Sequence, residues 1–127
     1  MPRTRKDEAP VLVDVPVLEG RYVELDDYTV SFETSRDDAD GTPLFRGLPD
    51  DRCQCPHWGY VVTGSLTYRF ADHEETVHAG EAFYLPPGHV PVGNAPDSVI
   101  VQFSPTDELR QTEKVLFANL QAMESAS

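Results

Sequence analysis

Short stretches of apolar residues, some of them alternating with polar ones, run along most of the chain and predict β-strands. They lie at 11–19, 20–35, 60–70, 76–92 and 97–105. The stretch 60–70 predicts one strand, a bend at Gly64 and a second strand, whereas a proline within 11–19 is typical of an edge strand. Many short strands with turns between them indicate an all-β sandwich or barrel.

The C-terminal part has a different pattern, which predicts an α-helix over residues 104–123. Ser104 is suited to cap the helix and Pro105 to occupy its first position. One face of this helix is apolar and consists of Leu109, Leu116, Leu120 and Met123. We therefore divide the chain into a flexible tail at 1–10, a β-barrel at 11–105 and a helical segment at 106–127.

Length and charge restrict the classes of function. With 127 residues, 39% of them hydrophobic, the chain fits one compact domain. A formal net charge of −12 argues against nucleic acid and against anionic membranes as partners. The first ten residues lack the apolar stretch of a secretion signal, so we expect a soluble cytoplasmic protein.

Two stretches carry a resemblance to a known family. Residues 53–70 (CQCPHWGYVVTGSLTYRF) and 80–94 (GEAFYLPPGHVPVGN) resemble the two sequence motifs of the cupins. The strand that ends at Gly64 matches the first motif, and Gly80, Pro86 and Gly88 have the spacing of the second. The resemblance implies a double-stranded β-helix, that is, a jelly-roll barrel, followed here by the C-terminal helix.

The positions that hold metal in cupins carry other residues in this chain. Counting back from the glycine of the first motif, His57 falls on the family's Glu position, Cys53 on its second His and Asp51 on its first. In the second motif Pro91 falls on the His position, and His89 precedes it by two residues. Because strand side chains alternate, a shift of two residues keeps the same face, so His89 is expected to point into the barrel.

The same parity places Cys53, Cys55 and His57 on one face if their segment is extended. Together with His89 they form a candidate metal site. The donors suit tetrahedral zinc first, with iron or copper as alternatives. We rank the histidines first, Cys53 next and Cys55 last, because a bend at Pro56 would turn Cys55 off the shared face. The alternative is that both cysteines fill the core as small apolar residues.

Two functions remain open. The first is a metal-dependent enzyme that acts on a small organic molecule, with one metal position free for water or substrate. The second is a non-catalytic module that binds or senses a small ligand and has a closed, structural Cys/His site. No acidic residue stands out as a catalytic base. We also expect a homodimer, formed through the strand at 11–19 or the C-terminal helix.

Overall fold

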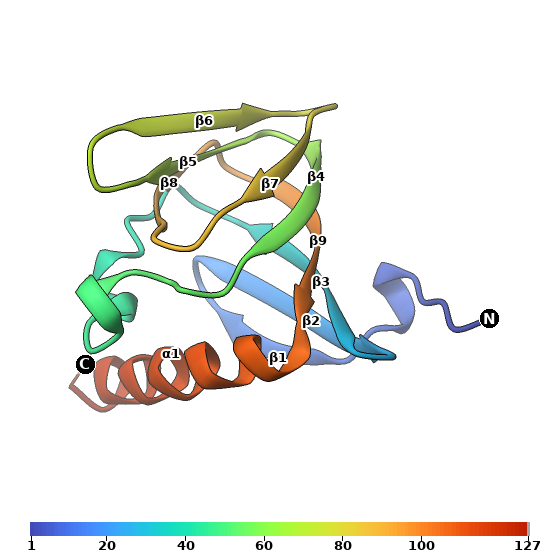
Figure 1. Cartoon of the computed structure of the whole chain (residues 1–127), viewed down its shortest axis with the longest axis horizontal. Helices are drawn as coiled ribbons and strands as arrows, with labels where there is room; N and C mark the ends of the chain where they lie inside the picture. The colour runs from blue at the N-terminus through green and yellow to red at the C-terminus, as the bar shows by residue number, and fades with distance from the viewer. Residues whose placement is uncertain (127) are drawn as a thin grey trace.

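The computed structural model describes residues 1–126, so the last residue of the predicted helical segment lies outside it. Within this range the chain forms nine strands and one long α-helix (Figure 1). The elements are β1 (Val11–Val15), β2 (Leu18–Leu25), β3 (Tyr28–Ser35), β4 (His57–Thr63), β5 (Ser65–Arg69), β6 (Glu74–His78), β7 (Ala82–Leu85), β8 (Val90–Asn94), β9 (Ser98–Pro105) and α1 (Thr106–Ala126). Short 3₁₀ turns occupy Lys6–Glu8, Thr42–Phe45 and Pro49–Asp51.

The strands form two antiparallel sheets. The larger has the order β1-β2-β3-β9-β4-β7, and the smaller has the order β6-β5-β8. Some neighbours in these sheets are distant in sequence, as when β9 lies between β3 and β4, and such crossovers are the connectivity expected of a jelly roll. Figure 1 shows the sheets facing each other, with α1 along one end of the space between them.

Two of the sequence predictions need correction. The stretch 20–35 is not one strand but parts of β2 and β3, joined by a tight hairpin in which Asp26 has a φ of 61°. Aspartate tolerates this left-handed conformation better than most residues. The helix begins at Thr106, because Ser104 and Pro105 continue β9 and pair with β3. Ser104 is therefore no helix cap.

Apolar side chains pack in two clusters. The first lies between the sheets and comprises Val61, Leu66, Tyr68, Leu85 and Ile100. The second joins α1 to the segment before β4 and comprises Phe45, Leu48, Cys53, Cys55, Val90 and Leu109. Among residues 1–126, no helix combines the length and the apolar composition needed to cross a membrane.

The bend between β4 and β5 requires glycine. Gly64 has a φ of 80°, and a Cβ there would lie 2.8 Å from Cα of Ser98. We expect Gly64→Ala to lower the free energy of unfolding by about 3 kcal/mol, through strained backbone and a backbone clash. Gly88→Ala, at a φ of 98° but with no atom within 4 Å, should cost only about 1 kcal/mol. Equal urea midpoints for the two variants would contradict this reading.

Candidate metal centre

Three of the four predicted ligands converge. One ligand atom each from Cys53, His57 and His89 lies within 4.8 Å of the other two, and all three side chains are buried. Sγ of Cys53 is 3.7 Å from Nε2 of His57. Tetrahedral zinc, with bonds of about 2.3 Å to sulfur and 2.0 Å to nitrogen, separates such atoms by about 3.5 Å. We call these three residues the Cys-His-His group.

Backbone pairing brings the group together. The amide of Cys53 donates to the carbonyl of His89 over 2.9 Å, and the amide of Gly88 donates to the carbonyl of Cys53 over 2.7 Å. This isolated bridge joins the two cupin-like motifs at their ligand residues. His57 opens β4 next to it, with its ring centroid 5.1 Å from that of His89.

Hydrogen bonds orient both imidazoles. Nδ1 of His89 lies 2.7 Å from the carbonyl oxygen of Pro86, which can only accept, so this nitrogen carries the proton and Nε2 keeps a free lone pair. Nδ1 of His57 lies 2.6 Å from Oγ of Ser104, so that its Nε2 faces Cys53. Metal-binding histidines typically have their second nitrogen fixed in this way.

Burial sets the protonation states. It lowers the pKa of His57 to about 3, with the charge of His89 as a further cause, and lowers the pKa of His89 to about 4. Both rings are therefore neutral at pH 7, the form that binds metal. Burial raises the pKa of the Cys53 thiol to about 11, so a metal that binds there must displace its proton.

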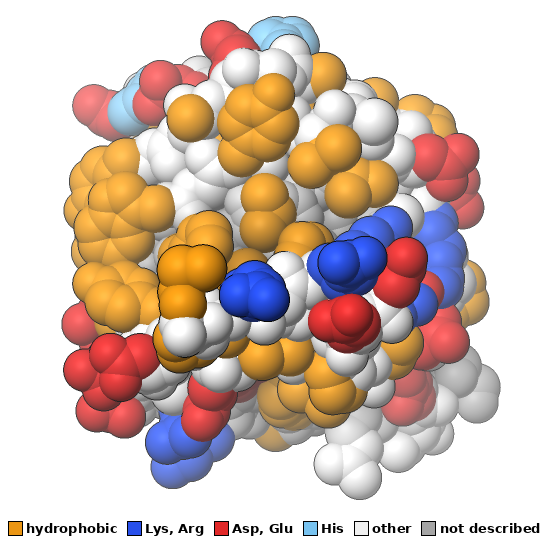
Figure 2. Space-filling view, turned by 90° about the vertical axis from the view of Figure 1, so that its right-hand side faces the viewer, with side chains coloured by type: hydrophobic (Ala, Val, Ile, Leu, Met, Phe, Trp, Pro, Cys, Tyr) orange, Lys and Arg blue, Asp and Glu red, His pale blue; other side chains and the backbone are white. Residues whose placement is uncertain are grey.

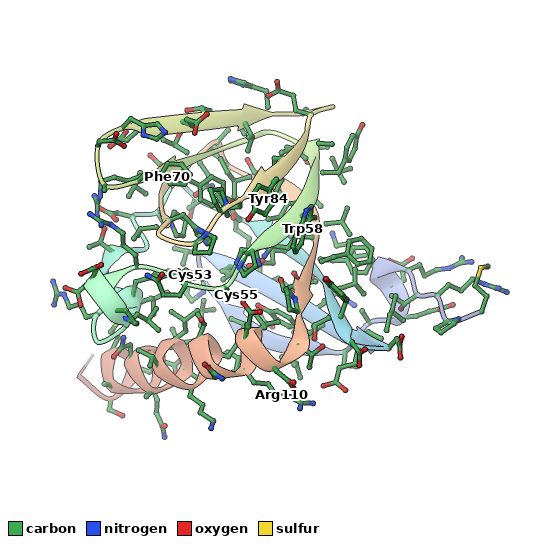
Figure 3. All side chains as sticks on the ribbon, viewed as in Figure 1. Cys53, Cys55, Trp58, Phe70, Tyr84 and Arg110 are labelled. Carbon is green, nitrogen blue, oxygen red and sulfur yellow. The ribbon has the colours of Figure 1, made fainter. Side chains whose placement is uncertain are left out.

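Cys55 is not brought to the other three. The chain bends at this residue ahead of Pro56, so the segment is not extended and the alternation assumed from the sequence fails. Sγ of Cys55 lies 3.4 Å from the carbonyl oxygen of Pro56, within the cluster that packs against α1. Both cysteines are free thiols, and Figure 3 shows them on the segment above α1.

The Cys-His-His group borders a cavity of about 300 Å³ between the two sheets. Most of its walls are apolar side chains, among them Leu66, Leu85 and Ile100. Glu33 and Gln102 also line the cavity, and the Nε2 group of Gln102 donates to a carboxylate oxygen of Glu33 over 2.8 Å. The group thus lies where a small molecule enclosed by the fold can reach it.

The polar partners of the site do not stand out in the sequence. Ser104 has the pattern of a helix cap, yet it hydrogen bonds His57 from an inward position of β9. Glu33 is one of 22 acidic residues and stood out by no motif. The strand alternation in 28–35 is misleading here, because its apolar residues Tyr28, Val30 and Phe32 have the opposite parity to Glu33, which lines the cavity.

Solved structures share this architecture. KdgF from a Halomonas species superposes with a TM-score of 0.56 and 24% identity, over 80% of this chain and 92% of that one. An RmlC-like cupin from Shewanella frigidimarina NCIMB 400 gives 0.55 and 15%, over 80% and 88%. The chain has a cupin fold. HppE in its iron(II) form superposes with a TM-score of 0.55 and 13% identity, over 82% of this chain and 60% of that one.

No protein-family model and no curated protein matches the chain. The likeness to these cupins therefore concerns the fold. The structure shows where the residues at the cupin metal-ligand positions lie. Cys53 and His57, which fall on cupin ligand positions, both face the cavity, whereas Asp51 accepts a hydrogen bond from the Gly47 amide over 3.0 Å and lies outside the group. Pro91 lies in β8 and lines the cavity without a ligand atom.

Proposed function

We propose that this protein is a metal-dependent cupin that binds a divalent transition metal through Cys53, His57 and His89 and acts on a small organic molecule in the cavity. The observation that carries the proposal is the convergence of three buried ligand atoms from two separate motifs at the wall of that cavity. Two imidazoles whose rings are held in place by hydrogen bonds and one thiol are a set of donors that fits such a metal.

Zinc is the metal we expect first. A thiolate with two imidazoles suits zinc, and also copper or iron, but it is a poor match for hard ions such as magnesium. When bound, the metal would supply Lewis-acid chemistry. His57 and His89 would bind through the nitrogens that their hydrogen bonds leave free, and Ser104 would hold the ring of His57 in place.

The arrangement favours an enzyme over a purely structural site. A structural zinc site is normally closed by four protein ligands, whereas catalytic sites have three and keep one position open. The fourth residue needed to close this site was Cys55, and among residues 1–126 the group of mutually close donors does not include it. An open position facing the cavity is what a metal-dependent reaction requires.

The test is the metal content of the protein purified without chelator and without nickel affinity resin. We expect about one equivalent of zinc per chain, measured by elemental analysis. Iron or copper at the same stoichiometry would support the same site with a different metal. A protein that neither retains any of these metals nor takes them up on titration would contradict the proposal.

We further propose a homodimer in the cytoplasm whose partner is a small molecule, not nucleic acid or membrane. The larger sheet exposes five aromatic side chains on its outer face: Tyr28, Trp58, Tyr60, Tyr84 and Phe103. Apolar side chains gather across the upper part of this face in Figure 2, and Figure 3 shows Trp58 and Tyr84 there. Exposed apolar patches mark interaction sites, so this patch is a better dimer contact than the strand at 11–19 or the helix.

Light scattering at micromolar concentration should therefore give twice the monomer mass of 14.2 kDa. Trp58→Glu, which places a charge in the centre of the aromatic patch, should shift the protein to monomer. The matched control is Glu74→Gln. Glu74 lies on β6, in the smaller sheet and outside the patch, so this variant should leave the mass unchanged. A parent protein at 14.2 kDa would contradict the dimer.

A further inference from the structure

One strand connects the Cys-His-His group to a second polar site in the cavity. Consecutive inward positions of β9 are Gln102 and Ser104, about 7 Å apart along the strand. Ser104 hydrogen bonds His57, and Gln102 donates to Glu33 over 2.8 Å. Gln102, the partner of Glu33, therefore lies one inward strand position from the residue that orients a proposed metal ligand.

Gln102 has an unused acceptor. Its side chain is only 8% exposed and lines the cavity, and its Oε1 atom has no hydrogen-bond partner among the described residues. An unpaired buried carbonyl oxygen is costly. A ligand with an O–H or N–H group in the cavity would satisfy it. The neighbouring carboxylate of Glu33 offers a second acceptor to the same donor.

The charges around the cavity are of one sign. Glu33 and Glu113 line it, and among its described lining residues there is neither lysine nor arginine. Burial, together with the charge of Glu113, raises the pKa of Glu33 to about 7, against a hydrogen bond from Ser31 that lowers it. Without a metal, the cavity therefore has no group to neutralise a phosphate or a carboxylate, and burying such an anion beside these acids would be unfavourable.

We infer that the cavity binds an uncharged, mostly apolar molecule with a hydroxyl or amine N–H group, and that Glu33 and Gln102 are the acceptors for that group, sharing the single hydrogen of a hydroxyl. The metal-free protein excludes anionic molecules of the same size. This inference deepens the proposed function, since the bound molecule would lie beside the Cys-His-His group. Binding by Glu33 and Gln102 does not itself require the metal, so the two ideas can be tested separately.

The experiment measures binding to the metal-free protein by calorimetry at pH 8, with three probes of similar size. They are 2-naphthol, 2-methoxynaphthalene, which has the shape without the donor, and 2-naphthoate, which is an anion. We expect 2-naphthol to bind at least about tenfold more tightly than the methoxy compound, the usual effect of losing hydrogen bonds to buried acceptors. We expect 2-naphthoate to bind more weakly still, by about 100-fold relative to 2-naphthol.

Glu33→Met and Gln102→Met each remove one of the two acceptors while keeping side-chain length. Each should reduce the preference for 2-naphthol over 2-methoxynaphthalene severalfold, and circular dichroism shows whether each variant is folded. Glu74→Gln, an exposed acid outside the cavity, is the control and should change nothing.

The inference would be overturned if 2-naphthol bound no more tightly than 2-naphthoate or no more tightly than the methoxy compound. It would also be overturned if 2-naphthol did not bind at 1 mM, about the upper limit of weak ligand binding. An unchanged preference in both folded variants would overturn it as well. A protein that takes up zinc but fails these tests would leave the proposed metal site intact. A protein that binds 2-naphthol but no metal would overturn the proposed function alone.

Discussion

Replacing either His57 or His89 with alanine is expected to weaken zinc binding by more than about 100-fold. Loss of a residue that only orients a ligand already costs about 10–100-fold, so loss of one of three ligands must cost more. Both rings are buried and neutral, and each contributes one nitrogen to the Cys-His-His group. The measurement is a competition titration of each metal-free variant against a zinc-binding dye.

The same series contains its own controls. Ser104→Ala should fall between parent and ligand variants, because it removes the hydrogen bond to Nδ1 of His57 but no donor. Cys55→Ser and the exposed His78→Ala should bind zinc like the parent, since neither residue is in the group. If Cys55→Ser loses zinc as His57→Ala does, or if all variants bind equally, the ligand assignment is wrong.

Acid is expected to destabilise the metal-free protein between pH 6.5 and pH 4, through its two buried histidines. His57 and His89 have pKa values of about 3 and 4 in the fold, against 6.5 for an ordinary histidine, so the unfolded chain binds two more protons than the folded chain between pH 6.5 and 4. Glu33, with its pKa raised to about 7, and Glu113, also raised, act in the opposite direction above pH 4.5. Stability therefore rises with pH through this window, in proportion to the surplus of protons on the unfolded chain.

The net loss of unfolding free energy from pH 6.5 to pH 4 is expected to be on the order of 3 kcal/mol, at about 1.4 kcal/mol per proton and pH unit. Urea unfolding of chelator-treated protein at several pH values measures it. A double variant, His57→Gln with His89→Gln, should lose this acid destabilisation and, because Glu33 and Glu113 remain, become more stable as the pH falls, whereas the exposed His78→Gln should behave like the parent. A parent protein of constant stability over this range would contradict the burial of neutral histidines.

Much of the fold was predictable because short-range patterns in the sequence determine it. The spacing of apolar residues and the residues that form turns predict the strands around Gly64, the β-strand at 97–105 and the C-terminal helix. The hairpin at Asp26 was missed, because aspartate at positive φ leaves no signal as strong as glycine. The cap at Ser104 was misplaced for a similar reason: serine and proline suit a helix start, but pairing with β3 extends the strand through both.

The candidate site was partly predictable. The spacing of the motifs was enough to bring Cys53, His57 and His89 forward as candidates. Cys55 was included because its segment was assumed to be extended. The bend ahead of Pro56 keeps its sulfur out of the Cys-His-His group. Glu33 and Gln102 come from strands 69 residues apart in sequence, and no single-sequence pattern reports such a pairing.

X-ray absorption at the zinc edge of the zinc-loaded protein tests the central claim most directly. The structure predicts a first shell with one sulfur at about 2.3 Å and the remaining ligands nitrogen or oxygen at about 2.0 Å. Multiple scattering from two imidazoles should accompany the single sulfur. Two sulfurs would bring Cys55 into a closed shell, and no sulfur would remove Cys53, so either result would contradict an open site formed by Cys53, His57 and His89.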